Sequence, residues 1–451
     1  MTFLNQRLGE NKMKKKVLAA FLAGSMVIAM GTGAFASDSD VSLSVTTTFA
    51  GEDGNAKNYQ DACKAFTDET QIEIKDSSAT SDETFKSRVA TDFETGSEPD
   101  VLFFFTGADA SPFIKEDKVV SLDEIREVYP EYADNMDDDK LPGNLVDDRH
   151  YAVPVNGYWE AMFCNTEVLD AAGVEVPGSD YTWDQFMDDC QKIKDAGYTP
   201  IAAALGEIPH YWWEYAIFNN TSLETHLEIP TSVDEGNGPG WVQGMEDIKS
   251  LYEAGYFPDN TLSAKDDETF AMFTDSKAAF LIDGSWKVGG IAATCQSDPD
   301  DPATLDQEKL DHFTVTYVPA KADSDRKATD LIGGISSGYY ITRKAWEDEE
   351  KRDAAVKFVE YMTTDDMVGK FAQHSATALK NTLEITDLNS LQNKAIEMIT
   401  NRTSLTGAVQ DAFNGECRVS TFDGMPDIVT GNVSAEDAVS EGLEMYAAQQ
   451  E

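Results

Sequence analysis

The chain has 451 residues and a formal net charge of −47, with 41% hydrophobic and 10% aromatic residues. This length exceeds one ordinary domain and suits two, and the hydrophobic content is sufficient for large cores. The acidic balance disfavours nucleic acid, anionic membranes and phosphate-rich ligands, and we interpret most of the charge as a solvated surface.

Residues 13–36 carry the pattern of an export signal. Lys14–Lys16 form a positive start, and the apolar segment Val17–Met30 is too short for a membrane span, which needs ~20 apolar residues. Ala34-Phe35-Ala36 is a cleavage site of the A-x-A type, so we predict a signal peptide that ends at residue 36 and a mature chain that begins at Ser37.

The segment before Met13 carries Glu10 and no apolar run, so Met13 is the predicted true start. No cysteine precedes Cys63, and no thiol near the cleavage site is therefore available for a lipid anchor. The expected location is the periplasm, the cell surface or the external medium.

The cysteines and histidines show no ligand spacing. The five cysteines are widely spaced, odd in number and without a C-x-x-C pair, so they indicate neither a disulfide framework nor a zinc site. One or two buried disulfides stay an alternative. The five histidines lack H-E-x-x-H, so we expect no metal and no cofactor.

The first part of the mature chain alternates strands with helices. We predict strands at 41–49, 72–78 and 98–105, and helices at 58–70 and 82–96. This order is typical of an α/β fold with a parallel sheet. Such sheets bind ligands beyond the carboxyl ends of their strands, which lie here near 49–54 and 103–109.

The remaining elements continue the mixed pattern. A helix begins at Thr182, the N-cap, and stops at Gly197. The other predicted elements are a strand through Val155, a strand at 159–164, a helix ending near Gly173, a buried strand at 200–205, two helices within 241–295, a strand at 278–283, a strand at 313–321 that runs into a connector, a strand pair at 331–343, and a mainly helical remainder.

Five phrases follow one another in a characteristic order. They are Tyr151-Ala152-Val153-Pro154, the segment NTEVLDAAGVEVP opened by Asn165, Thr182-Trp183-Asp184-Gln185-Phe186, the segment Phe273–Phe280 leading into Asp283-Gly284-Ser285-Trp286, and Gly333-Gly334 before a helix that ends in Phe358–Met362. Together, across about 37–451, they resemble the extracellular solute-binding proteins of carbohydrate ABC importers, the family that includes maltose-binding protein.

The resemblance implies a periplasmic-binding-protein-like fold of type II, with two α/β lobes, a ligand cleft and a hinge that the chain crosses three times. It places the N-terminal lobe at 37–150 and 322–373, the C-terminal lobe at 151–312 and 374–451, and a hinge crossing at 313–321. The implied protein is a monomer without enzymatic activity. It captures a sugar or oligosaccharide and delivers it to an ABC transporter permease in the membrane.

Two alternatives remain at this point. A secreted glycoside hydrolase would need two carboxylates that face each other across the scissile bond, and the abundance of acids leaves such a pair open. The same fold would also serve a non-sugar solute such as a polyamine, a metal chelate or a phosphodiester.

A sugar site needs aromatic platforms for the C–H faces of the rings, together with carboxylates and amides for the hydroxyl groups. We assign Trp183 to structure and leave Trp213 equally divided between core and ligand. The predicted ligand-binding residues are Glu52, Asp53, Phe105, Asp109, Tyr158, Tyr211, Trp212, Trp286, Ser336 and Ser337.

Overall fold

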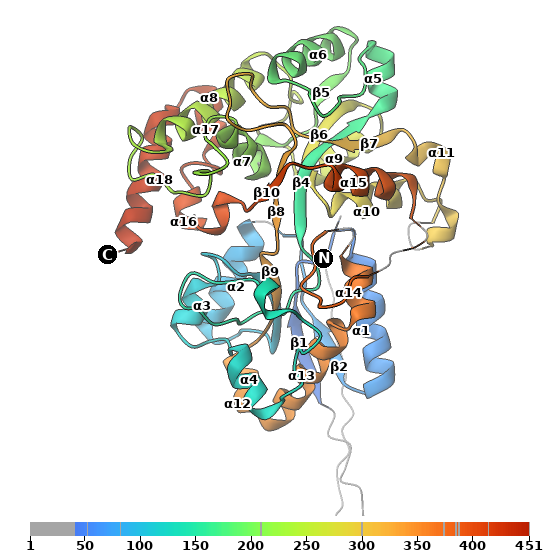
Figure 1. Ribbon diagram of the computed structural model, residues 1–451, viewed down its shortest axis with the longest axis vertical. Coiled ribbons are helices and arrows are strands. Elements are labelled where there is room, and N and C mark those ends of the chain that lie inside the picture. Colours follow the sequence, from blue (N-terminus) through green and yellow to red (C-terminus); the bar gives the residue numbers. More distant parts are fainter. Residues whose placement is uncertain are drawn as a thin grey trace, which may run out of the picture. The chain divides into compact units, whose positions relative to one another are not determined.

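The computed structural model describes residues 41–450, apart from residues 52, 82, 208–209, 299–300, 373–374, 384–385, 387 and 414. The predicted export signal and its cleavage site lie outside the described residues. Within the part of the chain that is described, no helix is long and apolar enough to cross a membrane. The described strands form two sheets, each with its own helices (Figure 1).

The first sheet has the strand order β2-β1-β3-β9. β1 pairs in parallel with β2 and β3, as predicted, and β9 runs antiparallel to β3. The strands are β1 (Ser42–Thr46), β2 (Glu73–Asp76), β3 (Val101–Phe105) and β9 (Ser337–Ile341). The associated helices are α1 (Ala56–Thr70), α2 (Glu83–Thr95), α3 (Ser111–Lys115), α4 (Leu122–Val128), η1 (Asp138–Lys140), α12 (Arg343–Glu347), α13 (Glu349–Met362) and α14 (Asp365–Phe371).

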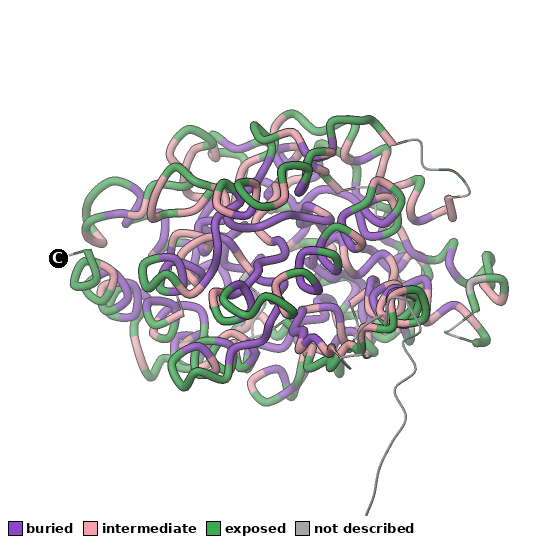
Figure 2. Tube along the Cα trace, turned by 90° about the horizontal axis from the view of Figure 1, so that it is seen from below, coloured by how far each residue is buried: buried purple, intermediate pink, exposed green. Residues whose placement is uncertain are grey.

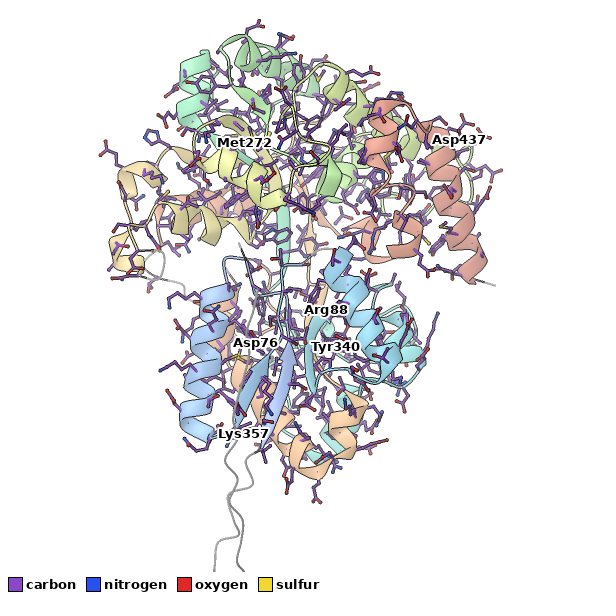
Figure 3. All side chains as sticks on the ribbon, turned by 180° about the vertical axis from the view of Figure 1, so that it is seen from behind. Asp76, Arg88, Met272, Tyr340, Lys357 and Asp437 are labelled. Carbon is purple, nitrogen blue, oxygen red and sulfur yellow. The ribbon has the colours of Figure 1, made fainter. Side chains whose placement is uncertain are left out.

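Helices cover this sheet because their apolar residues repeat at helical spacing. Tyr59, Ala62 and Phe66 of α1 are buried, and they lie on one face of the helix. Tyr340 of β9, labelled in Figure 3, is 2% exposed and donates a hydrogen bond to the Phe105 carbonyl at 2.9 Å. Figure 2 shows the buried segments running through the interior and the exposed ones at the outside.

The second sheet has the order β10-β8-β4-β6-β5, and β7 also pairs with β4. The strands are β4 (Tyr158–Asn165), β5 (Thr199–Ile201), β6 (Ala278–Gly284), β7 (Phe313–Thr316), β8 (Asp330–Gly334) and β10 (Ser404–Thr406). The helices that follow in this part are α5 (Thr166–Ala172), α6 (Trp183–Asp195), η2 (Leu205–Glu207), α7 (His210–Phe218), α8 (Gly238–Glu253), α9 (Asp266–Thr274), α10 (Lys287–Thr294), η3 (Pro302–Thr304), α11 (Gln307–Leu310), α15 (Ser390–Thr400), η4 (Val409–Asp411), α16 (Gly415–Arg418), α17 (Met425–Thr430) and α18 (Ala435–Gln450).

Local sequence signals set the ends of α5 and α6 as predicted. Gly173 ends α5 with φ of 66°, a left-handed conformation that glycine adopts at little cost. Thr182 caps α6 in a capping box, in which Gln185 N–H donates to the Thr182 hydroxyl and the Gln185 side chain accepts from Thr182 N–H. All five cysteines are unbridged, so the disulfide alternative is not supported.

The described chain passes between the two sheets three times: between β3 and β4, between β8 and β9, and between α14 and α15. These passages meet at Gly157, whose N–H donates to the Ala376 carbonyl at 2.7 Å. A Cβ atom on Gly157 would lie 2.3 Å from the Gly334 carbonyl oxygen, so only glycine fits between the neighbouring main chains.

The strand pairing corrects two predictions about these passages. The predicted strand pair at 331–343 is not a hairpin, because β8 and β9 belong to different sheets and the chain crosses at 335–336. The predicted hinge crossing at 313–321 contains β7, which pairs with β4 inside the second sheet. Residues 313–334 therefore run with the second sheet, although the boundaries given above assign 322–334 to the N-terminal lobe.

The segment between β8 and β9 was predicted as a hairpin because a glycine- and serine-rich turn between two apolar runs suits a hairpin and a crossing equally well. A third prediction was also wrong: the strand through Val155 is reduced to an isolated bridge between Val153 and Tyr339. The remaining lobe boundaries stay a prediction.

Candidate functional site

Two of the predicted aromatic residues meet beside the end of β6. Trp286 follows the strand, and its ring centroid lies 5.7 Å from that of Tyr211 in α7, with the two ring planes at 50°. Tyr211 is 7% exposed, whereas Trp286 keeps part of its surface open. A Cβ atom on Gly284 would lie 2.1 Å from the Trp286 indole, so glycine lets the ring fold back against the strand end.

Charged groups lie directly beside this aromatic pair. Asp283 of β6 is fully buried and accepts the Gly284 N–H at 2.7 Å. The Lys287 Nζ lies 3.8 Å from Asp283 and 2.9 Å from Asp266. Burial lowers the pKa of Lys287, but Asp283 and Asp266 raise it more, so the ammonium group stays charged.

The first sheet contributes Asp53, from the loop between β1 and α1. Its carboxylate accepts the Asn55 N–H at 2.7 Å. Burial raises the pKa of Asp53 to about 7, although the Asn55 N–H and Lys287 lower it. Lys287 opens α10 in the second part of the chain, so Asp53 and the Trp286 region are electrostatically coupled. Glu52, predicted beside Asp53, lies outside the described residues.

A second group of acids surrounds Tyr158, at the start of β4. Glu214 of α7 is fully buried and accepts the N–H groups of Val409 and Gln410 at 2.9 and 2.8 Å. Burial raises its pKa to about 8, although these two N–H groups lower it. Burial also raises the pKa of Asp411 to about 7, while Lys86, Arg418 and Tyr158 lower it.

Glu160, two residues further along β4, is fully buried, and burial raises its pKa well above the ordinary range. Sequence reasoning missed these acids, because a buried glutamate on a strand or helix looks like any other in a chain this acidic. Within the described part of the chain, no group of three or more Asp, Glu, His or Cys side chains is arranged to hold a metal ion.

Four further predicted residues lie near the crossing between β8 and β9. Phe105 pairs with Ser337 across the β3–β9 ladder, and the Lys86 Nζ lies 4.8 Å from the Phe105 ring centroid. The Ser336 carbonyl accepts the Thr106 N–H at 2.8 Å. Ser336 and Ser337 are both half-buried. Tyr158 pairs with Gly334 at the other side of the crossing.

Asp109 lies in the loop between β3 and α3, and its carboxylate already has partners. The Arg418 Nη2 lies 3.2 Å from both of its oxygens, and the Lys86 Nζ lies 3.4 Å away. Burial raises the pKa of Asp109, but Lys86 and Arg418 more than offset this effect and hold the pKa below its usual range.

The neighbouring tryptophans of α7 pack in the core. Trp212 is 2% exposed and lies 5.8 Å from Phe257, measured between ring centroids. Trp213 is fully buried between Trp241 and Phe422. Trp212 therefore offers no open ring face for the predicted ligand contact, and we assign both tryptophans to the core.

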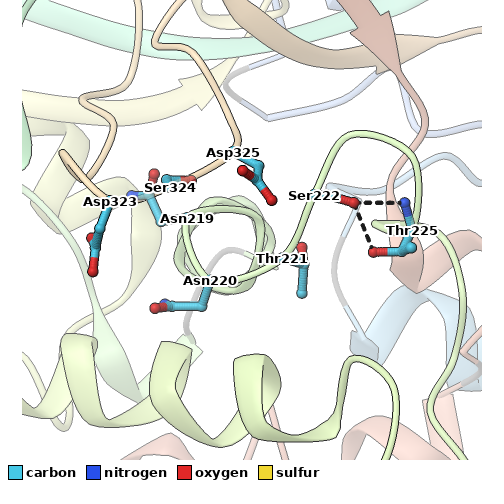
Figure 4. A pocket seen from close by; sticks show the side chains of 8 residues that line it. All are labelled: Asn219, Asn220, Thr221, Ser222, Thr225, Asp323, Ser324 and Asp325. Atoms are coloured by element: carbon cyan, nitrogen blue, oxygen red, sulfur yellow. Dashed lines mark hydrogen bonds between the residues drawn. The ribbon is translucent and has the colours of Figure 1, made fainter.

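A separate hollow of about 400 Å³ lies beside the C-terminal end of α7. Figure 4 shows Asn219 and Asn220 from the helix end, opposite Asp323, Ser324 and Asp325 of a loop. Only amide, hydroxyl and carboxylate side chains line this hollow. Because it lacks an aromatic platform, it does not have the chemistry expected of a sugar site.

Comparison with solved structures shows the same fold in carbohydrate-related proteins. One neighbour comes from a study of xylan utilization by the thermophilic bacterium Caldanaerobius polysaccharolyticus, with a TM-score of 0.73, 18% identity, and coverage of 90% of this chain and 100% of that chain. A chitin oligosaccharide binding protein has a TM-score of 0.73, 18% identity, and coverage of 90% and 98%. The solute-binding protein RafE, solved with raffinose, has a TM-score of 0.67, 16% identity, and coverage of 91% and 100%.

No curated relative matches the chain. The model of one protein family does match it, over residues 50–368, which include the elements from α1 to α13 and the Trp286 region. The proteins of this family bind solutes outside the cytoplasm and are not enzymes. The chain therefore belongs to the bacterial extracellular solute-binding protein family.

Proposed function

We propose that this protein captures a sugar or an oligosaccharide outside the cytoplasm and delivers it to an ABC transporter permease. Family membership supports a solute ligand and an ABC transporter partner. The neighbours support the choice of ligand, since one is named for chitin oligosaccharides, one was solved with raffinose and one with stachyose.

The observation that carries the proposal is the pairing of Trp286 and Tyr211 beside Asp283. A partly open indole supplies a platform for the C–H face of a sugar ring, and carboxylates accept hydrogen bonds from its hydroxyl groups. Asp53 adds a carboxyl group from the first sheet. A ligand between these groups would contact both sheets and favour the arrangement in which they approach each other.

One observation favours a second candidate, a cationic solute such as a polyamine. Besides burial, Glu214 and Asp411 raise the pKa of Glu160, and Asp411 raises that of Glu214. All three acids raise the pKa of Tyr158. A positive charge placed there would stabilise the carboxylates. The same screen distinguishes the two ligand classes.

The test is a thermal-shift screen with monosaccharides, oligosaccharides and polyamines. A ligand raises the apparent stability by RT ln(1 + [L]/Kd), so the hit identifies the class. We expect Trp286→Ala to abolish the shift while leaving the ligand-free Tm nearly unchanged. Trp183→Ala, which removes another half-buried tryptophan, should keep the shift and serves as the control.

A large fall in the ligand-free Tm of Trp286→Ala would instead assign Trp286 to the core. A shift with polyamines alone would replace the sugar proposal by the second candidate. If no sugar or polyamine shifts the wild-type protein, both ligand assignments fail.

A further inference from the structure

Arg418 joins the second part of the chain to elements of the first sheet. It is the last residue of α16 and is 1% exposed. Its Nη1 donates to the carbonyls of Gln410 and Phe413 at 3.1 and 2.6 Å, which fixes the guanidinium against its own part of the chain. Its Nη2 points away from these carbonyls, toward the first sheet.

The partners of that nitrogen are two acids from a helix and a loop that accompany the first sheet. Nη2 lies 3.2 Å from both carboxylate oxygens of Glu83, at the start of α2, and 3.2 Å from both oxygens of Asp109. In Figure 1, α16 lies next to α2, in agreement with these distances. The Arg418 guanidinium therefore contacts both parts of the chain, the one that carries the second sheet and the one that carries the first.

Lys86 completes a network of two cations and two anions. Its Nζ lies 2.8 Å from Glu83 and 3.4 Å from Asp109. The side chains of Lys86 and Asp109 are only 11% and 15% exposed, so solvent and salt screen these charges less than they screen surface pairs. Neutralising Glu83 and Asp109 would remove the two carboxylates that Arg418 contacts from the first part of the chain, which is costly as long as the buried guanidinium stays between them.

A main-chain contact lies beside this network. The Ala108 N–H donates to the Asp411 carbonyl at 2.6 Å. A Cβ atom on Gly107 would lie 1.9 Å from the same carbonyl oxygen, so the loop between β3 and α3 approaches η4 as closely as backbone allows.

We propose that Arg418, with Glu83, Lys86 and Asp109, forms a latch that holds the two lobes together without a ligand. Asp109 then acts in lobe closure rather than as the ligand contact expected from the sequence. The latch raises the closed fraction of the free protein, and the apparent Kd for any ligand of the closed state equals the intrinsic Kd divided by that fraction. Only this effect on affinity rests on the proposed function.

The first measurement uses the protein without ligand. Spin labels are attached to cysteines introduced at Gln60 in α1 and Glu397 in α15, two exposed positions that belong to different sheets, in a Cys63→Ser background. Double electron–electron resonance then gives the distribution of distances between the labels. The latch variant is Glu83→Gln/Asp109→Asn, which keeps the side-chain shapes and leaves Arg418 free to reach water when the lobes separate.

The control is Asp117→Asn/Glu124→Gln. These two acids flank Arg343 at 2.7 and 2.6 Å, and all three residues belong to the first sheet's part of the chain. We expect the latch variant to shift to longer label distances and the control to match the wild type. Equal distributions for the latch variant and the wild type would overturn the proposal, whichever ligand the protein binds.

The second measurement uses the ligand found in the thermal-shift screen and two single variants. If the four residues form a latch, Glu83→Gln and Asp109→Asn should each raise the apparent Kd. A variant that lowers the closed fraction of the free protein about 10-fold raises the apparent Kd about 10-fold. If Asp109 contacts the ligand instead, only Asp109→Asn raises Kd. Circular dichroism and the ligand-free Tm establish that each variant is folded.

Discussion

At the scale of single residues, two positions decide the properties of the candidate site. Gly284 sets the position of the Trp286 indole, because the ring occupies the space that a Cβ atom would take. Asp411 sets a pH dependence, because its carboxyl group is buried beside other acids. Neither role follows from residue type alone, and each leads to a measurement.

Gly284→Ala should move the Trp286 ring and weaken ligand binding. The atoms nearest to the new methyl group would be the far edge of the indole, 2.1–2.4 Å away, and this edge can swing aside while the strand stays in place. We expect a rise in Kd of about 10-fold, by calorimetry, with a small change in the ligand-free Tm. Gly369→Ala, where the nearest atom is a leucine methyl group at 3.6 Å, is the control. An unchanged Kd would show that the ligand does not use the ring in this position.

Asp411→Asn should change how stability depends on pH. The native pKa is about 7, above the value of ~3.9 in an unfolded chain, so the native state holds a proton that the unfolded state releases between these pH values. Wild-type stability therefore falls as pH rises from about 4 to 7, by at most about 1.4 kcal/mol per pH unit from this group.

The variant has no such proton, so its free energy of unfolding should improve relative to the wild type as pH rises from 5 to 7. Urea unfolding at several pH values measures this difference. Glu441→Gln, at an exposed position on α18, should follow the wild-type curve. If the Asp411→Asn curve is parallel to that of the wild type, Asp411 does not hold a proton at neutral pH.

At the scale of elements, the loop between β3 and α3 and the helix η4 form one contact. Gly107→Ala would place a methyl group 1.9 Å from the Asp411 carbonyl oxygen, and a main-chain atom cannot rotate away as a side chain does. The clash is relieved when the two elements separate. We therefore expect a rise in Kd of about 10-fold, together with a ligand-free Tm near that of the wild type. A lower Tm without a change in Kd would mean that the contact is permanent.

Elements with strong local signals were predicted well, and those that depend on distant partners were not. Thr182 was predicted to begin one helix and Gly173 to end another, and both predictions are confirmed, because local hydrogen bonds fix these helix ends. The crossing between β8 and β9 looks like a hairpin in the sequence, because the choice between one sheet and two depends on residues far away in the chain.

The same limit applies to the candidate site. Trp286 and Tyr211 were both chosen from the sequence as ligand-binding candidates, and the structure brings their side chains together. Arg418 carries no local signal, since its partners Glu83 and Asp109 lie more than 300 residues earlier. Trp346 likewise depends on distant partners: it is 7% exposed because Tyr129 and Arg352 cover its ring.

At the scale of the whole molecule, a methyl group at Gly107 and one at Gly157 are expected to have different effects on the opening of the two lobes. Both glycines fit against main-chain atoms, but Gly107 lies where the two parts meet and Gly157 lies where the chain passes between them. Opening would relieve a clash at Gly107. We expect opening not to relieve one at Gly157, because this residue contacts the other two passages, at Gly334 and Ala376, rather than the facing surface of a lobe.

Gly157→Ala should therefore lower stability in every state. The new methyl group would lie 2.3 Å from the Gly334 oxygen and 2.9 Å from the Ala376 oxygen, and overpacking of this kind costs about 1–3 kcal/mol. We expect a lower Tm in thermal unfolding, with the stabilisation by ligand retained. Gly143→Ala, which meets no atom within 4 Å, should leave both quantities unchanged. If the variant kept the wild-type Tm but lost the response to ligand, Gly157 would belong to the contact that changes when the lobes close. The crossing at Gly157 would then not be the hinge about which the lobes move.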